Sequence, residues 1–303
     1  MNKEFVSHGK TILIGEHSVV YGYNALSLPV KGLTLTTTVS PSDSGPNLYT
    51  NTYRGSFAGA PDEFGGISSI VEGLILQQNL SRNVSLTYTG EIPMERGLGS
   101  SAAVALGTAR AIDAYYGLGL SEDEIVAWAN KSETITHGSA SGLDVATVKS
   151  EHLVSFNKTD GPQEITTQLG ACLVISDTGE LGSTREAVSQ VRTQISESEQ
   201  KKSSMTTLGT LADRAIDAWK QADAGQLGSI FNKAQGILRE FSLSTRAIDH
   251  INQVALENGA MGSKLSGSGL GGVVISLVKD SATAQRVRSK LDSMAQNVWI
   301  EAI

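Results

Sequence analysis

The sequence predicts an α+β protein built from two lobes. Its 303 residues are enough for two domains of ordinary size, each with an apolar core of its own. Strand-like runs of apolar residues are mixed with helical patterns in both halves of the chain. A turn-forming pair, Gly161-Pro162, lies near the middle. We therefore predict an N-terminal lobe over residues 1–162 and a C-terminal lobe over residues 163–303.

The N-terminal half is predicted to contain three strands and at least two helices. The strands cover residues 11–14, 33–39 and 84–88. Ser, Gly, Pro and Asn are frequent in residues 40–66, which predicts a long surface loop bordering the substrate site. Apolar residues from Ile67 to Ile75 share one helical face, and Ser121 with Glu124 forms a capping box for a further helix. We expect these helices to cover the sheet.

The C-terminal half is predicted to be mostly helical between strands. A strand over residues 171–176 leads into a long helical region over residues 183–258, which polar residues 196–204 interrupt. The remaining predicted elements follow in chain order: strands at 261–265 and 273–278, a helix at 281–294 and a strand at 298–300. A second α+β lobe is the simplest account of this order.

The composition excludes several classes of function. A charged fraction of 18% and a hydrophobic fraction of 40% are typical of a globular protein. The net charge of -7 argues against broad attraction to nucleic acid or anionic lipid, so an anionic ligand would be held by a few local donors. No run approaches the roughly 18 apolar residues of a membrane span, and the start does not resemble a signal peptide. We expect a cytoplasmic protein with no nucleic-acid or membrane partner, in which Cys172 is a buried structural thiol.

A glycine-bearing segment over residues 93–103 follows a predicted strand and opens an Ala-rich helix. Glycines let the backbone fold closely around an anion, and the free N–H groups of the following helix point at it. Ser100 and Ser101 add hydroxyls that suit phosphate oxygen or magnesium. The segment therefore predicts a binding loop for a di- or triphosphate, although taken alone it also fits an ordinary loop with serine caps.

Two other segments carry candidate site residues. Residues 267–272 are rich in glycine but lead into a strand, which excludes a Rossmann dinucleotide fingerprint and leaves a simple hairpin as the alternative. Near the start, Lys10 precedes an apolar strand, and Glu16 and His17 follow it. Position 4 is Glu4, so the Gly9-Lys10-Thr11 run lacks the first glycine of a Walker loop. Polar residues at strand ends are typical of binding sites, although each could also be a solvated surface residue.

Together the three segments resemble the GHMP kinases, a family of ATP-dependent small-molecule kinases. The family order is G-K-x-x-x-x-G-E-H near the start, P-x-x-x-G-L-G-S-S-A in the middle and G-x-K-x-[ST]-G-x-G-x-G-G near the end, and the motifs span nearly the whole chain. His8 stands where many members have proline, and Ser268 and Leu270 replace the usual Ala and Gly. The resemblance implies an N-terminal lobe like ribosomal protein S5 domain 2, a ferredoxin-like C-terminal lobe and a site in the cleft between them.

Within the family the sequence is most similar to the mevalonate kinase branch. Residues 15–22 resemble its G-E-H-[AS]-V-V-[YH]-G element, and residues 133–144 resemble E-x-x-x-H-G-x-x-S-G-x-D. Residues 177–188 resemble its D-T-G element followed by S-T-[KR]-x-x-V. This likeness implies transfer of the γ-phosphate of ATP to the 5-hydroxyl of mevalonate, with Mg²⁺ as the cofactor and ATP and mevalonate as the small-molecule partners.

The resemblance also implies roles for individual residues. Asp144 would be the base and Lys10 the cation of the catalytic pair, and Glu16 and His17 would orient the acceptor. Ser101 and Glu133 would hold magnesium. The ATP-binding residues would be Arg96, Gly97, Leu98, Gly99, Ser100, Ser101, Ala102, Ser141 and Ser266. Three residues of the other lobe, Thr178, Thr184 and Arg185, would close the cleft or contact substrate.

Several alternatives remain at the level of the sequence. Phosphomevalonate kinase is the runner-up among the kinases and galactokinase is a further one, and mevalonate diphosphate decarboxylase belongs to the same superfamily. A nucleotide-binding regulator that has lost catalysis is a further alternative, although it would not need Lys10, Ser101, Glu133 and Asp144. Asp144 could instead be the N-cap of a short helix starting near Val145. Glu133 with His137 could be an ordinary helix-surface pair or a transition-metal pair, although the sequence offers no convincing third ligand. The oligomeric state, a homodimer among the options, does not follow from the sequence.

Overall fold

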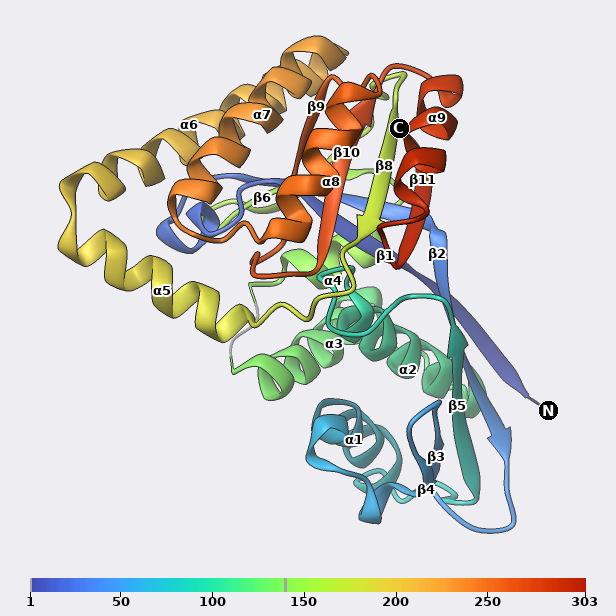
Figure 1. The fold of residues 1–303 in the computed structure, drawn as a ribbon. Coiled ribbons are helices and arrows are strands. Elements are labelled where there is room, and N and C mark those ends of the chain that lie inside the picture. The colour runs from blue at the N-terminus through green and yellow to red at the C-terminus, as the bar shows by residue number, and fades with distance from the viewer. Residues whose placement is uncertain (1, 139–140) are drawn as a thin grey trace. The chain divides into compact units, whose positions relative to one another are not determined.

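The computed structural model describes residues 2–138 and 141–303, and they form two compact units (Figure 1). The first unit comprises Met1–Gly9, Leu33–Pro93 and Gly99–Glu151. The second comprises Lys10–Gly32, Met94–Leu98 and His152–Ile303. The strands β1 (Lys3–Ile14) and β2 (Ala25–Pro41) contribute residues to both units. The predicted phosphate loop is likewise shared between them.

Strands of the first unit form a sheet around β2 and β5. Its shorter strands are β3 (Asn47–Tyr49), β4 (Arg54–Ser56) and β5 (Val84–Gly90). The segment of β2 from Leu35 to Pro41 pairs antiparallel with β5, while β3 lies parallel to β5 and antiparallel to β4. Alternate residues of this part of β2, such as Val39, are buried, as one-sided burial of an antiparallel sheet requires.

The helices of the first unit pack around α2. They are α1 (Gly65–Val71), which continues as a π-helical turn (Glu72–Leu76), α2 (Ser100–Tyr116), α3 (Glu122–His137) and α4 (Leu143–Lys149). Helix α2 contacts α1, α3 and α4, and its alanine-rich buried face suits such close packing. At Gly107 a Cβ would lie 2.6 Å from Thr37 Oγ1, so only glycine lets α2 approach β2 there. Two 3-10 turns, Phe57–Gly59 and Asp62–Phe64, precede α1.

A four-stranded antiparallel sheet organises the second unit. Its strands are β8 (Cys172–Asp177), β9 (Gly262–Ser266), β10 (Val273–Val278) and β11 (Asn297–Ala302), in the spatial order β11-β8-β10-β9. The helices α8 (Arg246–Glu257) and α9 (Ser281–Leu291) pack on this sheet (Figure 1). This strand order and the β-α-β-β-α-β chain order are those of a ferredoxin-like domain, as predicted. Every residue of β8, β9 and β10 is buried, so the core of the unit lies on these strands.

The helical region between β8 and β9 is divided by polar N-caps. It contains α5 (Thr184–Glu197), α6 (Glu199–Lys220), α7 (Ala224–Glu240) and α8, and their N-cap side chains accept hydrogen bonds from first-turn N–H groups. The caps are Ser183, Ser198, Asp223 and Thr245. Such caps stabilise helix starts and separate successive helices. The unit also contains the 3-10 turn Ser18–Tyr21 and the hairpin of β6 (Leu153–Asn157) and β7 (Gly161–Ile165), with β6 pairing to Ala25–Ser27 of β2.

Most predicted elements are confirmed, and the exceptions have physical reasons. The interruption near residues 196–204 falls at Ser198, and the capping box of Ser121 and Glu124 opens α3. The predicted long loop over residues 40–66 is wrong, because β3 and β4 form a small hairpin there whose Leu48 is fully buried. The hairpin of β6 and β7 was not predicted, since β7 is mainly polar and exposed. The predicted boundary after residue 162 falls inside β7, and the division of the chain at that point stays a prediction.

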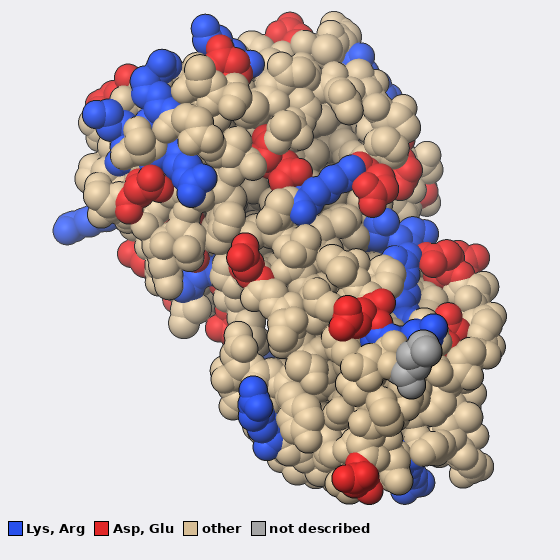
Figure 2. All heavy atoms as spheres, turned by 90° about the vertical axis from the view of Figure 1, so that its right-hand side faces the viewer, with Lys and Arg blue, Asp and Glu red and all other residues tan. Residues whose placement is uncertain are grey.

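Two further expectations concern the thiol and the surface. Cys172 is buried, and burial with the nearby charge of Asp280 raises the pKa of its thiol. On the face shown in Figure 2, the acidic and basic side chains are interspersed. Among the helices of the described residues, none combines the length and the apolar character needed to cross a bilayer.

Candidate active site

The phosphate loop has the backbone conformation that its glycines predict. Gly97 and Gly99 have φ angles of 77° and 74°, in the left-handed region that glycine adopts without strain. Gly99 is the N-cap of α2 and offers no side chain to the first N–H groups of the helix. Ser100, Ser101 and Ala102 then form the first turn, where unpaired N–H groups and the helix dipole favour an anion. The start of α2 can therefore bind a phosphate group.

Ser101 and Glu133, predicted together as magnesium ligands, are in direct contact in the first unit. The Ser101 hydroxyl donates a short hydrogen bond to the Glu133 carboxylate, although the residues belong to different helices. Glu133 is 5% exposed and lies one turn before the end of α3. The exposed His137 is 3.8 Å from the second carboxylate oxygen, which is the helix-surface pair left open by the sequence. Glu133 thus has both a half-buried hydroxyl partner and a neighbouring imidazole.

The donor chemistry of this pair suits Mg²⁺. Magnesium prefers oxygen ligands and is commonly bound through one or two protein groups, with water and phosphate oxygens completing its shell. Ser101 and Glu133 supply one hydroxyl and one carboxylate oxygen at the phosphate-binding end of α2. Among the described residues, no cluster of three or more His, Cys, Asp or Glu side chains is arranged to hold a metal. The residues present therefore fit a magnesium ion carried with a nucleotide better than a fully protein-bound ion such as zinc.

The predicted base lies on a short helix that packs against α2 and α3. Asp144 is the second residue of α4, and the N-cap is Gly142, with a φ of 86°. The interpretation of Asp144 as an N-cap is therefore wrong. The hydroxyl of Ser141 accepts a hydrogen bond from the Leu143 N–H at 3.2 Å, which fixes the turn before α4. The neighbouring Ser139 and Ala140 of the same motif lie outside the described residues.

The other group of predicted residues lies in the second unit, on β1 and the turn after it. Lys10 is only 3% exposed, inside a strand and not on the surface. Its backbone N–H donates to the Leu98 carbonyl at 2.9 Å, which ties β1 to the phosphate loop. His17 is 7% exposed and has a φ of 60°, unusual for a residue with a side chain. Its Nε2 donates to the Ser268 carbonyl at 2.9 Å, since a carbonyl can only accept.

Glu16 has a partner that the sequence analysis did not single out. Its carboxylate forms an ion pair with Lys264 of β9, and the two side chains are 2% and 0% exposed. Lys264 is the lysine of the G-x-K-x-[ST]-G motif, so the signal was present, but the motif gives no indication of what the lysine contacts. The Glu16 carboxylate is already engaged by this lysine. Its contact with substrate stays a prediction.

The glycine-rich segment forms the six-residue connection of the β9–β10 hairpin. It confirms the hairpin that was left open, and it also lies against the phosphate loop: a Cβ on Gly97 would be 3.8 Å from the Ser266 carbonyl. The hydroxyl of Ser266 donates to the Ile12 carbonyl at 2.9 Å and accepts from the Ile12 N–H at 3.1 Å. Ser266 therefore joins the turn to β1, and its contact with phosphate stays a prediction.

Arg96 of the phosphate loop is bound to the D-T-G element. Its guanidinium is 3.1 Å from the buried carboxylate of Asp177 and donates to the Gly179 carbonyl at 3.2 Å. The hydroxyl of Thr178 donates to the Gly272 carbonyl at 2.7 Å. The D-T-G element therefore supports the phosphate loop on one side and the glycine turn on the other.

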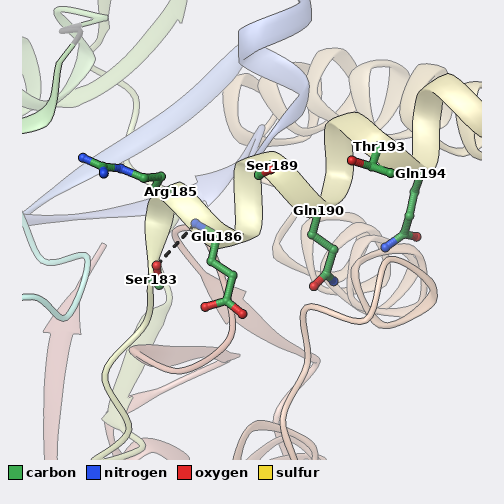
Figure 3. Close-up of a pocket in the computed structure, with 7 residues that line it drawn as sticks. All are labelled: Ser183, Arg185, Glu186, Ser189, Gln190, Thr193 and Gln194. Carbon is green, nitrogen blue, oxygen red and sulfur yellow. Dashed lines mark hydrogen bonds between the residues drawn. The ribbon is translucent and has the colours of Figure 1, made fainter.

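A shallow hollow lies along α5 (Figure 3). It is lined by Ser183, Arg185, Glu186, Ser189, Gln190, Thr193 and Gln194. Figure 3 shows Arg185 pointing away from Gln190 and Gln194. Both glutamine amides donate to the Phe241 carbonyl, at 2.7 and 3.0 Å, so they hold α5 to the end of α7. The contact of Arg185 with substrate stays a prediction.

Comparison with known proteins gives a consistent result over the whole chain. The family model described as the GHMP kinases N terminal domain matches residues 67–151, and the one described as GHMP kinases C terminal matches residues 215–297. Mevalonate kinase from Aeropyrum pernix is 31% identical over 302 residues, which cover 95% of this chain and 92% of that protein.

Solved structures agree with this assignment. The crystal structure of L. major mevalonate kinase in complex with R-mevalonate shares the fold with a TM-score of 0.85 at 24% identity, covering 98% of this chain and 94% of that one. The mevalonate kinase of methicillin-resistant Staphylococcus aureus MRSA252 is 27% identical with a TM-score of 0.75, covering 99% and 98%. The motifs, the fold and these relatives together show that the chain belongs to the GHMP kinase family.

Proposed function

We propose that this chain transfers the γ-phosphoryl group of ATP to the 5-hydroxyl of mevalonate, which gives ADP and 5-phosphomevalonate. The observation that carries the proposal is its likeness, at 31% identity over nearly the full length of both proteins, to a mevalonate kinase. The contact of the Ser101 hydroxyl with the Glu133 carboxylate at the start of α2 supports the proposal. Phosphoryl transfer depends on positioning and charge stabilisation more than on covalent catalysis, so such placement is what the reaction requires.

The start of α2 is proposed to bind the polyphosphate of ATP. Its unpaired N–H groups and dipole favour negative charge, and Gly97 and Gly99 allow a close backbone approach. Ser101 and Glu133 would hold Mg²⁺, which when bound would neutralise charge on the β- and γ-phosphates. The side chain of Arg96 supports this loop through Asp177, so we propose that Arg96 contributes to ATP binding through the shape of the loop.

Asp144 and Lys10 are proposed to act on the reacting groups. The carboxylate of Asp144 would accept the proton of the 5-hydroxyl, and the buried ammonium of Lys10 would stabilise charge on the transferring phosphoryl group. Burial makes the positive charge of Lys10 more effective, because water screens it less. His17 would orient the acceptor through its imidazole or through the turn that it holds.

The rival functions make different demands on the residues. A phosphomevalonate kinase must bind an additional phosphate on its acceptor, and we identified no extra basic cluster for it in the sequence. Mevalonate diphosphate decarboxylase releases carbon dioxide, and the pattern from Glu133 to Asp144 argues against that reaction. The cytoplasm stays our expectation for the place of the reaction, and a homodimer stays an open prediction.

A substrate panel tests the proposal. The purified chain is incubated with ATP and Mg²⁺ and, in separate reactions, with mevalonate, phosphomevalonate, galactose or homoserine, while ADP formation is followed. Of the four acceptors, we expect only mevalonate to be turned over rapidly. Turnover of galactose or homoserine without turnover of mevalonate would keep the kinase family and refute the proposed substrate.

A further inference from the structure

A fully buried ion pair joins two motifs that are far apart in the sequence. Lys264 and Glu16 are 248 residues apart, and their side chains are 0% and 2% exposed. The Lys264 ammonium donates to the Glu16 carboxylate and to the Leu265 carbonyl at 2.7 Å, and it lies 5.7 Å from the centre of the Phe231 ring. The pair is thus surrounded by protein on all sides.

Burying such a pair costs free energy, because both charges lose their hydration. Burial raises the pKa of Glu16 and lowers that of Lys264, because both charged forms lose their hydration. The attraction between the two charges opposes these pKa shifts. Buried ion pairs nevertheless often stabilise a fold no more than apolar side chains of similar size do. A buried ion pair does fix the relative position of the two segments that carry it, since its hydrogen-bonded atoms must meet in one geometry. A role in positioning therefore explains its presence better than stability does.

The pair lies among contacts that fasten the turn after β1 to the start of the glycine turn. The Glu16 carboxylate also accepts from the Gly267 N–H, and His17 Nε2 donates to the Ser268 carbonyl at 2.9 Å. Ser266 exchanges hydrogen bonds with the backbone of Ile12. All of these contacts lie within the second unit. They set the position of residues 15–18 relative to residues 266–272.

The backbone of His17 shows that this turn is held under strain. His17 combines a φ of 60° with a ψ of −42°, a sparsely populated conformation for a residue with a side chain, and such conformations persist only where the surroundings enforce them. His17 follows Glu16 directly, and Gly15 before it cannot carry a side chain, since a Cβ would lie 2.5 Å from Ala25 Cα. The Ser18 N–H donates to the Glu16 carbonyl at 2.6 Å and closes the turn across His17, and the ion pair holds the side chain of Glu16 directly before it.

We propose that Lys264 is a positioning residue of the reaction, acting through Glu16 to hold His17 and the Gly267–Gly272 turn in their functional arrangement. Glu16 then acts through this pair and not by touching the acceptor. The inference rests on the proposed function for its effect on turnover, whereas its effect on the two turns does not depend on which substrate is used.

The test separates positioning from stability with a double replacement. Lys264→Met and Glu16→Met each leave one charge buried without its partner, so each should unfold at a lower temperature than the wild type. The double variant Glu16→Met/Lys264→Met restores an apolar interior and should recover most of the unfolding temperature. We expect its kcat/KM for mevalonate to stay about 10- to 100-fold below that of the wild type, the usual effect of a displaced site.

A second measurement follows the turns themselves. Amide hydrogen exchange, read by mass spectrometry, should be faster in the double variant at residues 15–18 and 266–272 and unchanged in β11. Lys202→Met, which removes an exposed ion pair with Glu199, is the matched control and should alter neither readout. A double variant with wild-type stability, exchange and kcat/KM would overturn the proposal.

Two remaining outcomes are also decisive. If the double variant does not fold, Glu16→Gln takes its place, because it keeps the shape of the side chain and an acceptor for the Gly267 N–H. Unchanged exchange at residues 15–18 and 266–272 in that variant overturns the proposal, and faster exchange confined to them supports it. A wild-type chain that does not phosphorylate mevalonate refutes the proposed function alone, because hydrogen exchange needs no substrate.

Discussion

The hydrogen bond between Ser101 and Glu133 makes a quantitative prediction about magnesium. Ser101→Ala removes the donor and leaves a carboxylate, 5% exposed, without its hydroxyl partner. A hydrogen bond to a charged group contributes about 1.5–3 kcal/mol, so this replacement should lower the free energy of unfolding by a similar amount. If the Ser101 hydroxyl and the Glu133 carboxylate bind Mg²⁺, Ser101→Ala should also raise the magnesium concentration for half-maximal turnover by about 10- to 150-fold.

A double-mutant cycle tests whether one ion joins the two residues. Glu133→Gln removes the charge of the carboxylate. The combined variant should lose much less magnesium-binding free energy than the sum of the two single losses, with a coupling energy of about 0.5–3 kcal/mol. ADP formation is measured as a function of the free Mg²⁺ concentration for each variant, and urea unfolding gives the free energy of unfolding. Thr134→Ala, which removes an exposed hydroxyl on the same helix, is the control and should leave magnesium dependence unchanged. Strictly additive effects on magnesium would refute a shared ion.

Three further predictions concern the catalytic pair and His17. Asp144→Asn should fold and bind ATP but lose about 100- to 10,000-fold in kcat, measured by ADP release, because it removes the proposed base. Lys10→Met should also lower kcat, and a loss of melting temperature without a loss of kcat would contradict its role. Burial lowers the pKa of His17 from 6.5, so the unfolded chain binds a proton that the folded chain excludes. The contribution of His17 to stability should be complete above pH 6.5 and be lost as the pH falls through the lowered pKa. His17→Gln should lack this component of the pH slope in thermal unfolding, and an identical slope would contradict the assignment.

The sequence was most informative where chemistry and local conformation depend on neighbouring residues. The capping box at Ser121 and the glycine conformations of the phosphate loop follow from interactions within a few residues, and both are confirmed. The strand from Val273 to Val278 was predicted with its observed bounds, since a continuous buried run is bounded by turn residues on both sides. The contact of Ser101 with Glu133 was expected only through the family resemblance.

Other features could not be predicted because they depend on partners distant in the chain. The hairpin of β3 and β4 has only three residues in each strand, and backbone pairing with β5 stabilises it more than its own composition does. The pairing of Lys264 with Glu16 is invisible in either segment alone, and a lysine in a polar motif is usually exposed. The hydrogen bond from His17 to the Ser268 carbonyl likewise joins segments that are far apart in the chain.

The central claim is that this chain phosphorylates the 5-hydroxyl of mevalonate. Mass spectrometry and ³¹P NMR of the product from ATP, Mg²⁺ and mevalonate test it directly, with carbon dioxide measured in the same reaction. We predict one equivalent of ADP for each phosphate monoester formed at the primary hydroxyl, and no carbon dioxide. A product that carries phosphate at another position, release of carbon dioxide, or hydrolysis of ATP without transfer to mevalonate would contradict it.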